Sequence, residues 1–132
     1  MPYEELPHTA DWCLRVWAAD LAGLFSESAI GMNALAGVRL AEGPRARRTF
    51  ETIAPDPESL LVTFLSELVY VAEQERLAFD RFEAKVKSQV LKVEMEGAPI
   101  ISIDKAIKAV TYHNLQIRQT ARGYEVESVF DV

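Results

Sequence analysis

A long helix that begins at Pro57 limits how the rest of this chain can be arranged. Asp56 is a suitable N-cap, proline is favoured at the first helical position, and Glu58 complements the positive end of the helix dipole. Apolar residues then recur at helical spacing to about Gln74. The stripe that we predict to be buried contains Leu61, Phe64, Leu65, Leu68 and Ala72, widened by Val69, Tyr70 and Val71. Other elements must cover so broad a face, and we expect this helix to be the more deeply packed of two.

The second helix is predicted over residues 21–35, directly after a strand over residues 12–18. In that strand the apolar Leu14 and Val16 alternate with their neighbours at period two. Asp20 is a suitable N-cap for the helix, and Gly37 is a suitable residue for its end.

Further strands are predicted over residues 45–53, 79–87, 89–96, 109–120 and 124–130, with a tight connection near Ser88. The run Gly97-Ala98-Pro99 interrupts the pattern, residues 100–108 fit either a strand or a helical turn, and His113-Asn114 is a candidate bulge. This order of elements predicts a single α+β domain over residues 1–132. Its two helices pack on mostly antiparallel sheets, and its N- and C-terminal strands lie close together.

The charge balance argues against a protein that grips nucleic acid over a broad surface. The net charge is -6 and the pI is about 4.9, whereas non-specific nucleic-acid binding relies on dense lysine and arginine. No apolar run approaches the roughly 20 residues that a bilayer-spanning helix needs. The first residues are acidic and unlike a signal peptide. We therefore expect a cytoplasmic protein with no membrane contact and no stable direct binding to nucleic acid.

Carboxylates flank the first and last of the strongly patterned strands. Asp11 directly precedes the first of them, and Asp131 ends the last. If these strands are antiparallel neighbours, the start of one lies beside the end of the other; parallel neighbours would separate the two residues. Together with the chain-terminal carboxylate of Val132, they would suit a hard cation with oxygen ligands, calcium before a transition metal. The simpler interpretation is two solvated aspartates at strand ends.

Other reactive residue types allow both a functional and a structural interpretation. His8 and His113 are the only histidines and could bind metal with Asp11 or shuttle a proton, but local hydrogen bonding explains them equally well. Cys13 lies within a predicted strand, where a packed small apolar residue is expected rather than a nucleophile. A basic cluster is formed by Arg45, Arg47 and Arg48. It could bind phosphate or an acidic partner, or it could simply be solvated.

Several motifs along the whole chain resemble those of the archease family. The sequence His-Thr-Ala-Asp at residues 8–11, followed by a short strand, is similar to the N-terminal signature of that family. Residues 108–115, Lys-Ala-Val-Thr-Tyr-His-Asn-Leu, resemble its second signature. The chain ending over residues 123–132 and the helical residues 60–68 also match. The combination is specific, whereas the first motif alone is not.

The resemblance implies a non-enzymatic activator of the RtcB-type RNA ligase. That ligase joins RNA ends in tRNA splicing with GTP and a divalent metal, through a guanylylated histidine of its own. Archease-like proteins speed the guanylylation and support multiple turnover. In the family, an aspartate of the first signature and the C-terminal residues form a metal site, and the matching positions here are Asp11, Asp131 and Val132. Signature positions that could line the ligase-facing surface are His8, Lys108 and His113.

Two other functions stay open from the residues alone. A small metal-dependent hydrolase or isomerase could use His8, Asp11 and His113 around a metal, and would turn over a small substrate in isolation. A chaperone-like binding module is suggested by the broad apolar faces of the helices, and would expose apolar surface. Neither alternative explains why the two ends of the chain should meet. The sequence leaves the oligomeric state open.

Overall fold

Both helices begin at the N-caps identified in the sequence, and the first helix also ends at the glycine identified there. In the computed structural model, which describes residues 2–6, 12–112 and 115–132, α1 is Leu21–Ala36 and α2 is Pro57–Glu75. The side chains of Asp20 and Asp56 each accept an N–H of the following first turn at 2.7 Å. Gly37 ends α1 in the left-handed conformation, with a φ of 68°. Within the described residues, neither helix is both long enough and apolar enough to cross a membrane.

The first sheet joins the two ends of the chain. It contains β1 (Tyr3–Leu6), β2 (Trp12–Ala18), β7 (Ala109–Val110), β8 (Arg118–Thr120) and β9 (Gly123–Asp131). The strand order is β1-β2-β9-β7, β8 also pairs with β9, and every pairing is antiparallel. The N- and C-terminal strands are therefore close together, as predicted.

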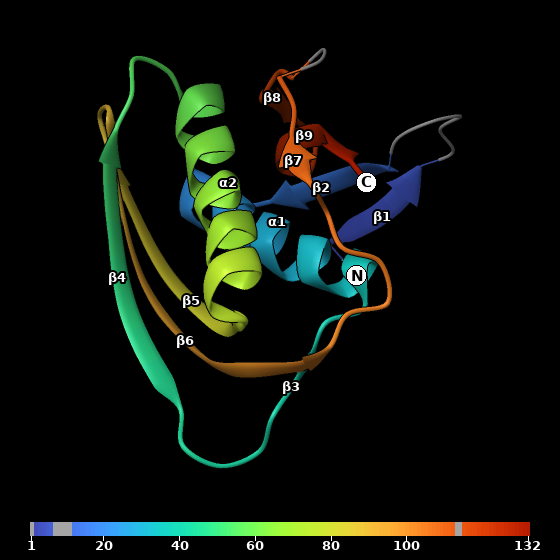
Figure 1. Ribbon diagram of the computed structural model, residues 1–132. Helices are drawn as coiled ribbons and strands as arrows, with labels where there is room; N and C mark the ends of the chain where they lie inside the picture. The colour runs from blue at the N-terminus through green and yellow to red at the C-terminus, as the bar shows by residue number, and fades with distance from the viewer. Residues whose placement is uncertain (1, 7–11, 113–114) are drawn as a thin grey trace.

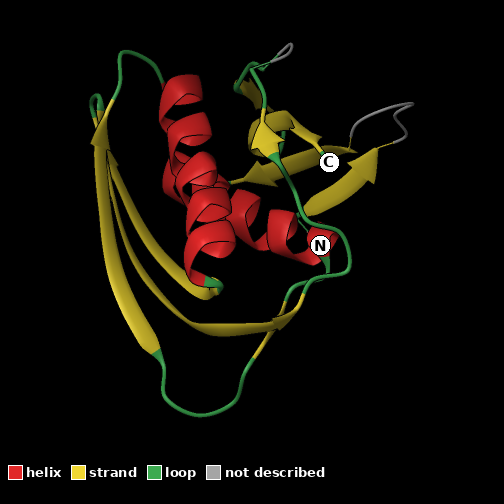
Figure 2. Ribbon diagram, viewed as in Figure 1, coloured by secondary structure: helices red, strands yellow, loops and turns green. Residues whose placement is uncertain are grey.

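The second sheet is built around one long strand. It contains β3 (Arg39–Leu40), β4 (Ala46–Ile53), β5 (Leu77–Lys87) and β6 (Val90–Ser102), and β6 pairs antiparallel with the other three. Figure 1 shows this sheet curving around the helices, with the first sheet on their other side. Figure 2 shows the resulting layers, in which both helices lie between strands. This confirms the α+β class with two helices on mostly antiparallel sheets.

The core lies between the layers, and α1 is more central than the sequence predicts. This helix contacts β2 of the first sheet and β5 of the second. Gly31 allows the close approach, because a Cβ there would lie 2.8 Å from Leu14 Cδ2 and 3.0 Å from Tyr3 Cγ. Each helix buries seven residues; those of α2 are all apolar, whereas those of α1 include Ser28 and Gly31. Tyr70, predicted to widen the buried face of α2, is 58% exposed.

Strand β6 passes through the run that the sequence predicts to be a break. Gly97 is what makes this continuity possible, because a Cβ there would lie 1.9 Å from the carbonyl oxygen of Ala78. Strand β5 shifts register between Phe79 and Arg81 at the same place. A glycine in a strand next to a bulge is typical of a close backbone approach.

The segment after β6 also differs from the prediction. The single strand expected over residues 109–120 is wrong, because among the described residues of that range the strands β7 and β8 at its two ends are separate and each pairs with β9. Residues 104–108 form no helical turn. The bulge predicted at His113-Asn114 lies outside the described residues. Strands β1 and β3, with four and two residues, are too short to show a recognisable alternation.

Candidate functional site

Strand β9 brings the ends of three distant segments together. It lies between β2 and β7, with Trp12 opposite Phe130 on one side and Ala109 opposite Asp131 on the other. The start of β2 and the start of β7 therefore both lie beside the end of β9. The antiparallel neighbourhood that the carboxylate hypothesis requires is confirmed for these strands.

The backbone of Asp131 is held in place while its side chain is exposed. The Lys108 N–H donates to the carbonyl oxygen of Asp131 at 2.7 Å, and the Thr111 N–H donates to that of Val129 at 3.0 Å. Phe130 is completely buried, and successive side chains of a strand point to opposite faces. The carboxylate of Asp131 is consequently directed away from the core, next to the half-buried Val132 at the chain end.

The segment that follows Lys108 is also tied to α2. Glu58, in the first turn of that helix, accepts the N–H of Ile117 at 2.9 Å through Oε2. The sequence identified Glu58 only as a favourable charge for the helix dipole, and nothing in its local pattern indicates this distant partner. The bond ties the chain to α2 directly before β8 begins.

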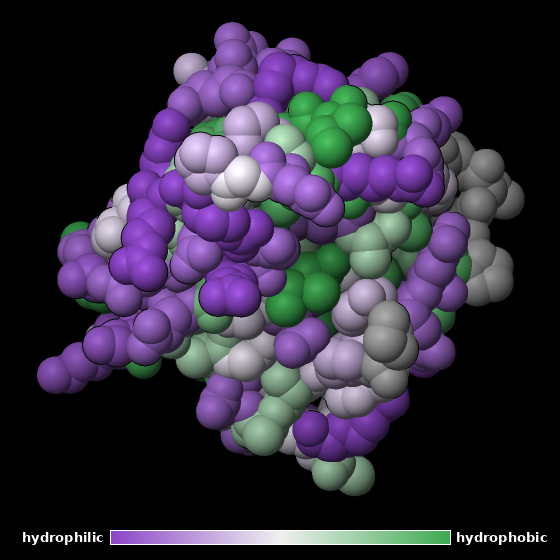
Figure 3. Space-filling model, turned by 90° about the horizontal axis from the view of Figure 1, so that it is seen from below, coloured by the Kyte–Doolittle hydropathy of each residue, from purple (hydrophilic) through white to green (hydrophobic). Residues whose placement is uncertain are grey.

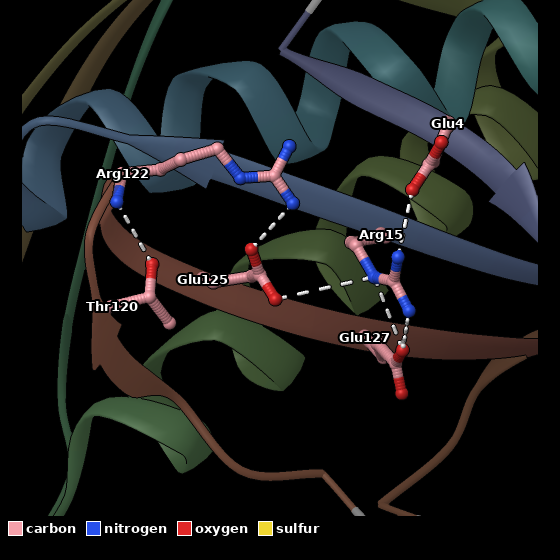
Figure 4. A network of polar contacts seen from close by, with 6 residues as sticks. All are labelled: Glu4, Arg15, Thr120, Arg122, Glu125 and Glu127. Atoms are coloured by element: carbon pink, nitrogen blue, oxygen red, sulfur yellow. Dashed lines mark hydrogen bonds and ion pairs between the residues drawn. The ribbon is translucent and has the colours of Figure 1, made fainter.

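Ion pairs on the outer face of the first sheet connect the strands that carry the site (Figure 4). Arg15 of β2 binds Glu4 of β1 at 2.9 Å and Glu127 of β9 at 2.8 Å. The hydrogen bond to Glu127 is the main cause that raises the pKa of Arg15, so this residue keeps its charge. Arg122 binds Glu125 at 2.8 Å and stacks over the Trp17 ring. These contacts hold β1, β2 and β9 in register.

The structure describes some of the predicted metal ligands but not the others. Asp11, His8 and His113 lie outside the described part of the chain. Asp131 and Val132 are described and adjacent, and the side chain of Asp131 supplies a carboxylate, a hard oxygen donor. Across residues 2–6, 12–112 and 115–132, no three His, Cys, Asp or Glu side chains lie together as a metal-binding group. The metal site stays a prediction that requires Asp11.

The Cys13 side chain is buried in the protein and is not placed to act as a nucleophile. It is 7% exposed, and burial is the largest cause that raises the pKa of its thiol. The negative charge of Glu127 raises this pKa further, whereas Arg15 opposes both effects. The thiol is therefore mostly protonated at neutral pH, which argues against a nucleophilic role.

We expect Cys13 to react with a disulfide reagent such as DTNB at least about tenfold more slowly in the native protein than in the guanidinium-unfolded chain at mildly alkaline pH. The reason is that the reagent requires an accessible thiolate. The release of thionitrobenzoate measures both rates, with Cys13→Ser as the blank. Equal rates in the two states would contradict the packed role.

The basic cluster is largely engaged within the protein. Arg45 pairs with Asp80 and, at 3.0 Å, with Glu96, while Arg48 pairs with Glu75 at the end of α2. Arg47 is 86% exposed on its side chain and lies 3.8 Å from Glu96. The structure thus gives these arginines local partners.

Comparison with known protein families matches nearly the whole chain. The model of the Archease protein family (MTH1598/TM1083) matches residues 3–132. The protein archease of Methanosarcina barkeri is 34% identical over 143 residues, which cover 98% of this chain and 95% of that protein. The protein archease of Methanopyrus kandleri is 31% identical over 140 residues, which cover 100% of both chains.

Solved structures have the same fold. The solution structure of protein 1598 from Methanobacterium thermoautotrophicum superimposes with a TM-score of 0.75 at 24% identity, over 99% of both chains. The crystal structure of a Thermotoga maritima archease, described as a possible chaperone, gives a TM-score of 0.71 at 21% identity, over 98% of this chain and 96% of that one. At these identities the likeness shows the fold.

Proposed function

Because this chain belongs to the archease family, we propose that it is a non-enzymatic activator of an RtcB-type RNA ligase in tRNA splicing. It would act in the cytoplasm by promoting guanylylation and multiple turnover of the ligase. The observation that carries the proposal is the meeting of three segments at the end of β9: the start of β2, residues 108–111 and the chain end. These are the segments whose motifs resemble the family signatures.

We further propose that a divalent cation, calcium first, binds at this end of the sheet through Asp11, Asp131 and the terminal carboxylate of Val132. The cation would supply positive charge among these carboxylates. Lys108 and Thr111 hold the backbone of β9 through their N–H groups, so the exposed Asp131 side chain starts from a fixed position. Carboxylate oxygens are donors that calcium favours.

Two ways of activating the ligase are consistent with this arrangement. The carboxylates could exchange a metal with the active site of the ligase, or the protein could bind the guanylylation-competent conformation of the ligase more tightly than other conformations. In both cases the RNA is held by the ligase, which agrees with the net charge of -6 on this chain. His8, Lys108 and His113 would line the ligase-facing surface, and the Lys108 side chain is exposed as this role requires.

The test is guanylylation of the cognate ligase with labelled GTP, with and without this protein. We expect faster labelling and more than one ligation per ligase molecule when the protein is present. No acceleration with a ligase from the same organism would overturn the proposed function.

A short extension after Val132 is expected to weaken both calcium binding and activation. The extension converts the terminal carboxylate into a neutral peptide group and so removes one oxygen anion from the proposed ligand set. The same extension placed before Met1 is the control and should have a smaller effect. Calcium titration calorimetry and the guanylylation assay measure the two properties. Equal losses from both extensions would contradict the role of the chain end.

The two alternative functions have separate tests. A hydrolase or isomerase would turn over a small substrate in the absence of any ligase. A chaperone-like module finds support in the description of the Thermotoga maritima relative, and it would suppress aggregation of unrelated proteins. The broad apolar faces that suggested it are buried between the two sheets, and Tyr70 is the one large apolar residue of α1 and α2 that is exposed. We therefore favour the activator.

A further inference from the structure

A cavity of about 580 Å³ lies between α1, α2 and the segment that leads from β6 to β7. Its apolar lining includes Met32 and Ala36 of α1, Leu68 of α2, and Ile103 and Ile107 of the connecting segment. This volume is within the range of ordinary ligand sites, which are largely apolar with a few polar groups. Figure 3 shows the lower side of the molecule, where apolar atoms gather near the centre of a mostly polar surface.

The wall of the cavity is already formed. The N–H groups of Asp104 and Lys105 both donate to the carbonyl oxygen of Ala36, at 3.0 and 3.1 Å. They satisfy a carbonyl at the end of α1 and fix the connecting segment against that helix. A partner would therefore meet a preorganised cavity and would lose little free energy in ordering it.

The charged groups at the cavity favour an anionic partner group. Arg76 and Lys108 line it, and neither side chain has an ion-pair partner among the described residues. Glu73 is the one acid in the lining. The lining contains no aromatic side chain on which a nucleobase could stack, so an aliphatic group fits better than a base.

We propose that this cavity docks a segment of the partner protein in which an aliphatic side chain lies next to a carboxylate. The aliphatic group enters the apolar lining, and the carboxylate meets Arg76 and Lys108. This inference rests on the proposed function, because it assigns the partner as the ligase. An apolar anchor in a preformed pocket with a charged neighbour is the usual form of an interaction hot spot.

The position of the cavity connects docking with the candidate site. Its wall ends at Lys108, whose N–H binds the carbonyl oxygen of Asp131 at 2.7 Å. A partner segment seated in the cavity would therefore lie beside the end of β9. Docking would orient the carboxylates of Asp131 and Val132 towards the same partner. The residues that line the cavity would not themselves bind the cation.

The test uses two variants that act on different parts of the proposed contact. Ala106→Trp fills the cavity from an exposed position of the connecting segment, and Arg76→Glu reverses one rim charge from an exposed side chain. The matched controls are Ala121→Trp in the exposed turn before β9 and Lys87→Glu at the far end of β5. Circular dichroism checks the fold of all four variants.

Calorimetry measures the Kd of each variant for the cognate ligase, and labelled GTP gives the guanylylation rate at saturating variant. We expect Ala106→Trp and Arg76→Glu to weaken binding at least about tenfold, the controls to stay within about twofold, and the rates at saturation to match the wild type.

If the wild type accelerates guanylylation and both test variants bind as tightly as it does, the docking inference is wrong and the proposed function stands. If only Ala106→Trp weakens binding, the carboxylate part of the proposal is wrong. If the wild type neither binds nor accelerates the ligase, the proposed function fails and the docking inference fails with it.

Discussion

Asp131→Asn is expected to lower both calcium affinity and ligase activation at least about tenfold, the scale on which changes around metal ligands act. Asparagine preserves the size of the side chain but removes its negative charge. The fold should persist, because the contacts of this residue with β7 and Lys108 are made by its backbone. Calcium titration calorimetry and the guanylylation rate with labelled GTP measure the two effects independently.

The matched control is Asp80→Asn, which makes the same chemical change on the second sheet. Asp80 is exposed and pairs with Arg45. Loss of such a solvent-screened surface pair should leave the fold, the calcium affinity and the activation intact. Asp11→Asn should reproduce the effect of Asp131→Asn if both residues bind the same cation. Activation retained by both variants would preserve the function and eliminate the proposed site.

Gly97→Ala is expected to destabilise the protein by about 3 kcal/mol, the upper part of the usual range for overpacking a core. The added Cβ would lie 1.9 Å from the carbonyl oxygen of Ala78 and 2.6 Å from the Cα of Phe79. Both are backbone atoms, so no side chain is able to rotate out of the way. For a domain of this size the melting temperature should fall by roughly 10 °C, measured by circular dichroism.

Gly43→Ala is the control, because the space around it is open. No atom lies within 4 Å of a Cβ at that position, but its φ of +112° is one that favours glycine. The control therefore has only the conformational cost, about 1 kcal/mol. If Gly97→Ala were no more harmful than Gly43→Ala, the close approach of β5 and β6 would not explain why glycine occupies position 97.

Local chemistry was enough to predict the elements whose signals are contained in a few neighbouring residues. Asp20, Asp56 and Gly37 mark helix ends in the sequence and act as caps in the structure, because capping depends on bonds between residues a few positions apart. The strand over residues 12–18 matches β2 because alternation is also local. The order of the predicted elements pointed to the α+β class and the motifs pointed to the family, both of which the comparisons support.

The sequence indicated that the two terminal strands are neighbours, but the individual partners of distant backbone groups were beyond such reasoning, because no local pattern encodes which partner a backbone group will find. Gly97 looks like a strand break in the sequence, yet in the fold it allows a backbone approach that keeps β6 continuous. Ile117 donates its N–H to Glu58, 59 residues away in the sequence. The meeting of Lys108 with Asp131 and the cavity beside it likewise arise only when β9 is inserted between β2 and β7, since pairing between strands depends on the whole packed arrangement.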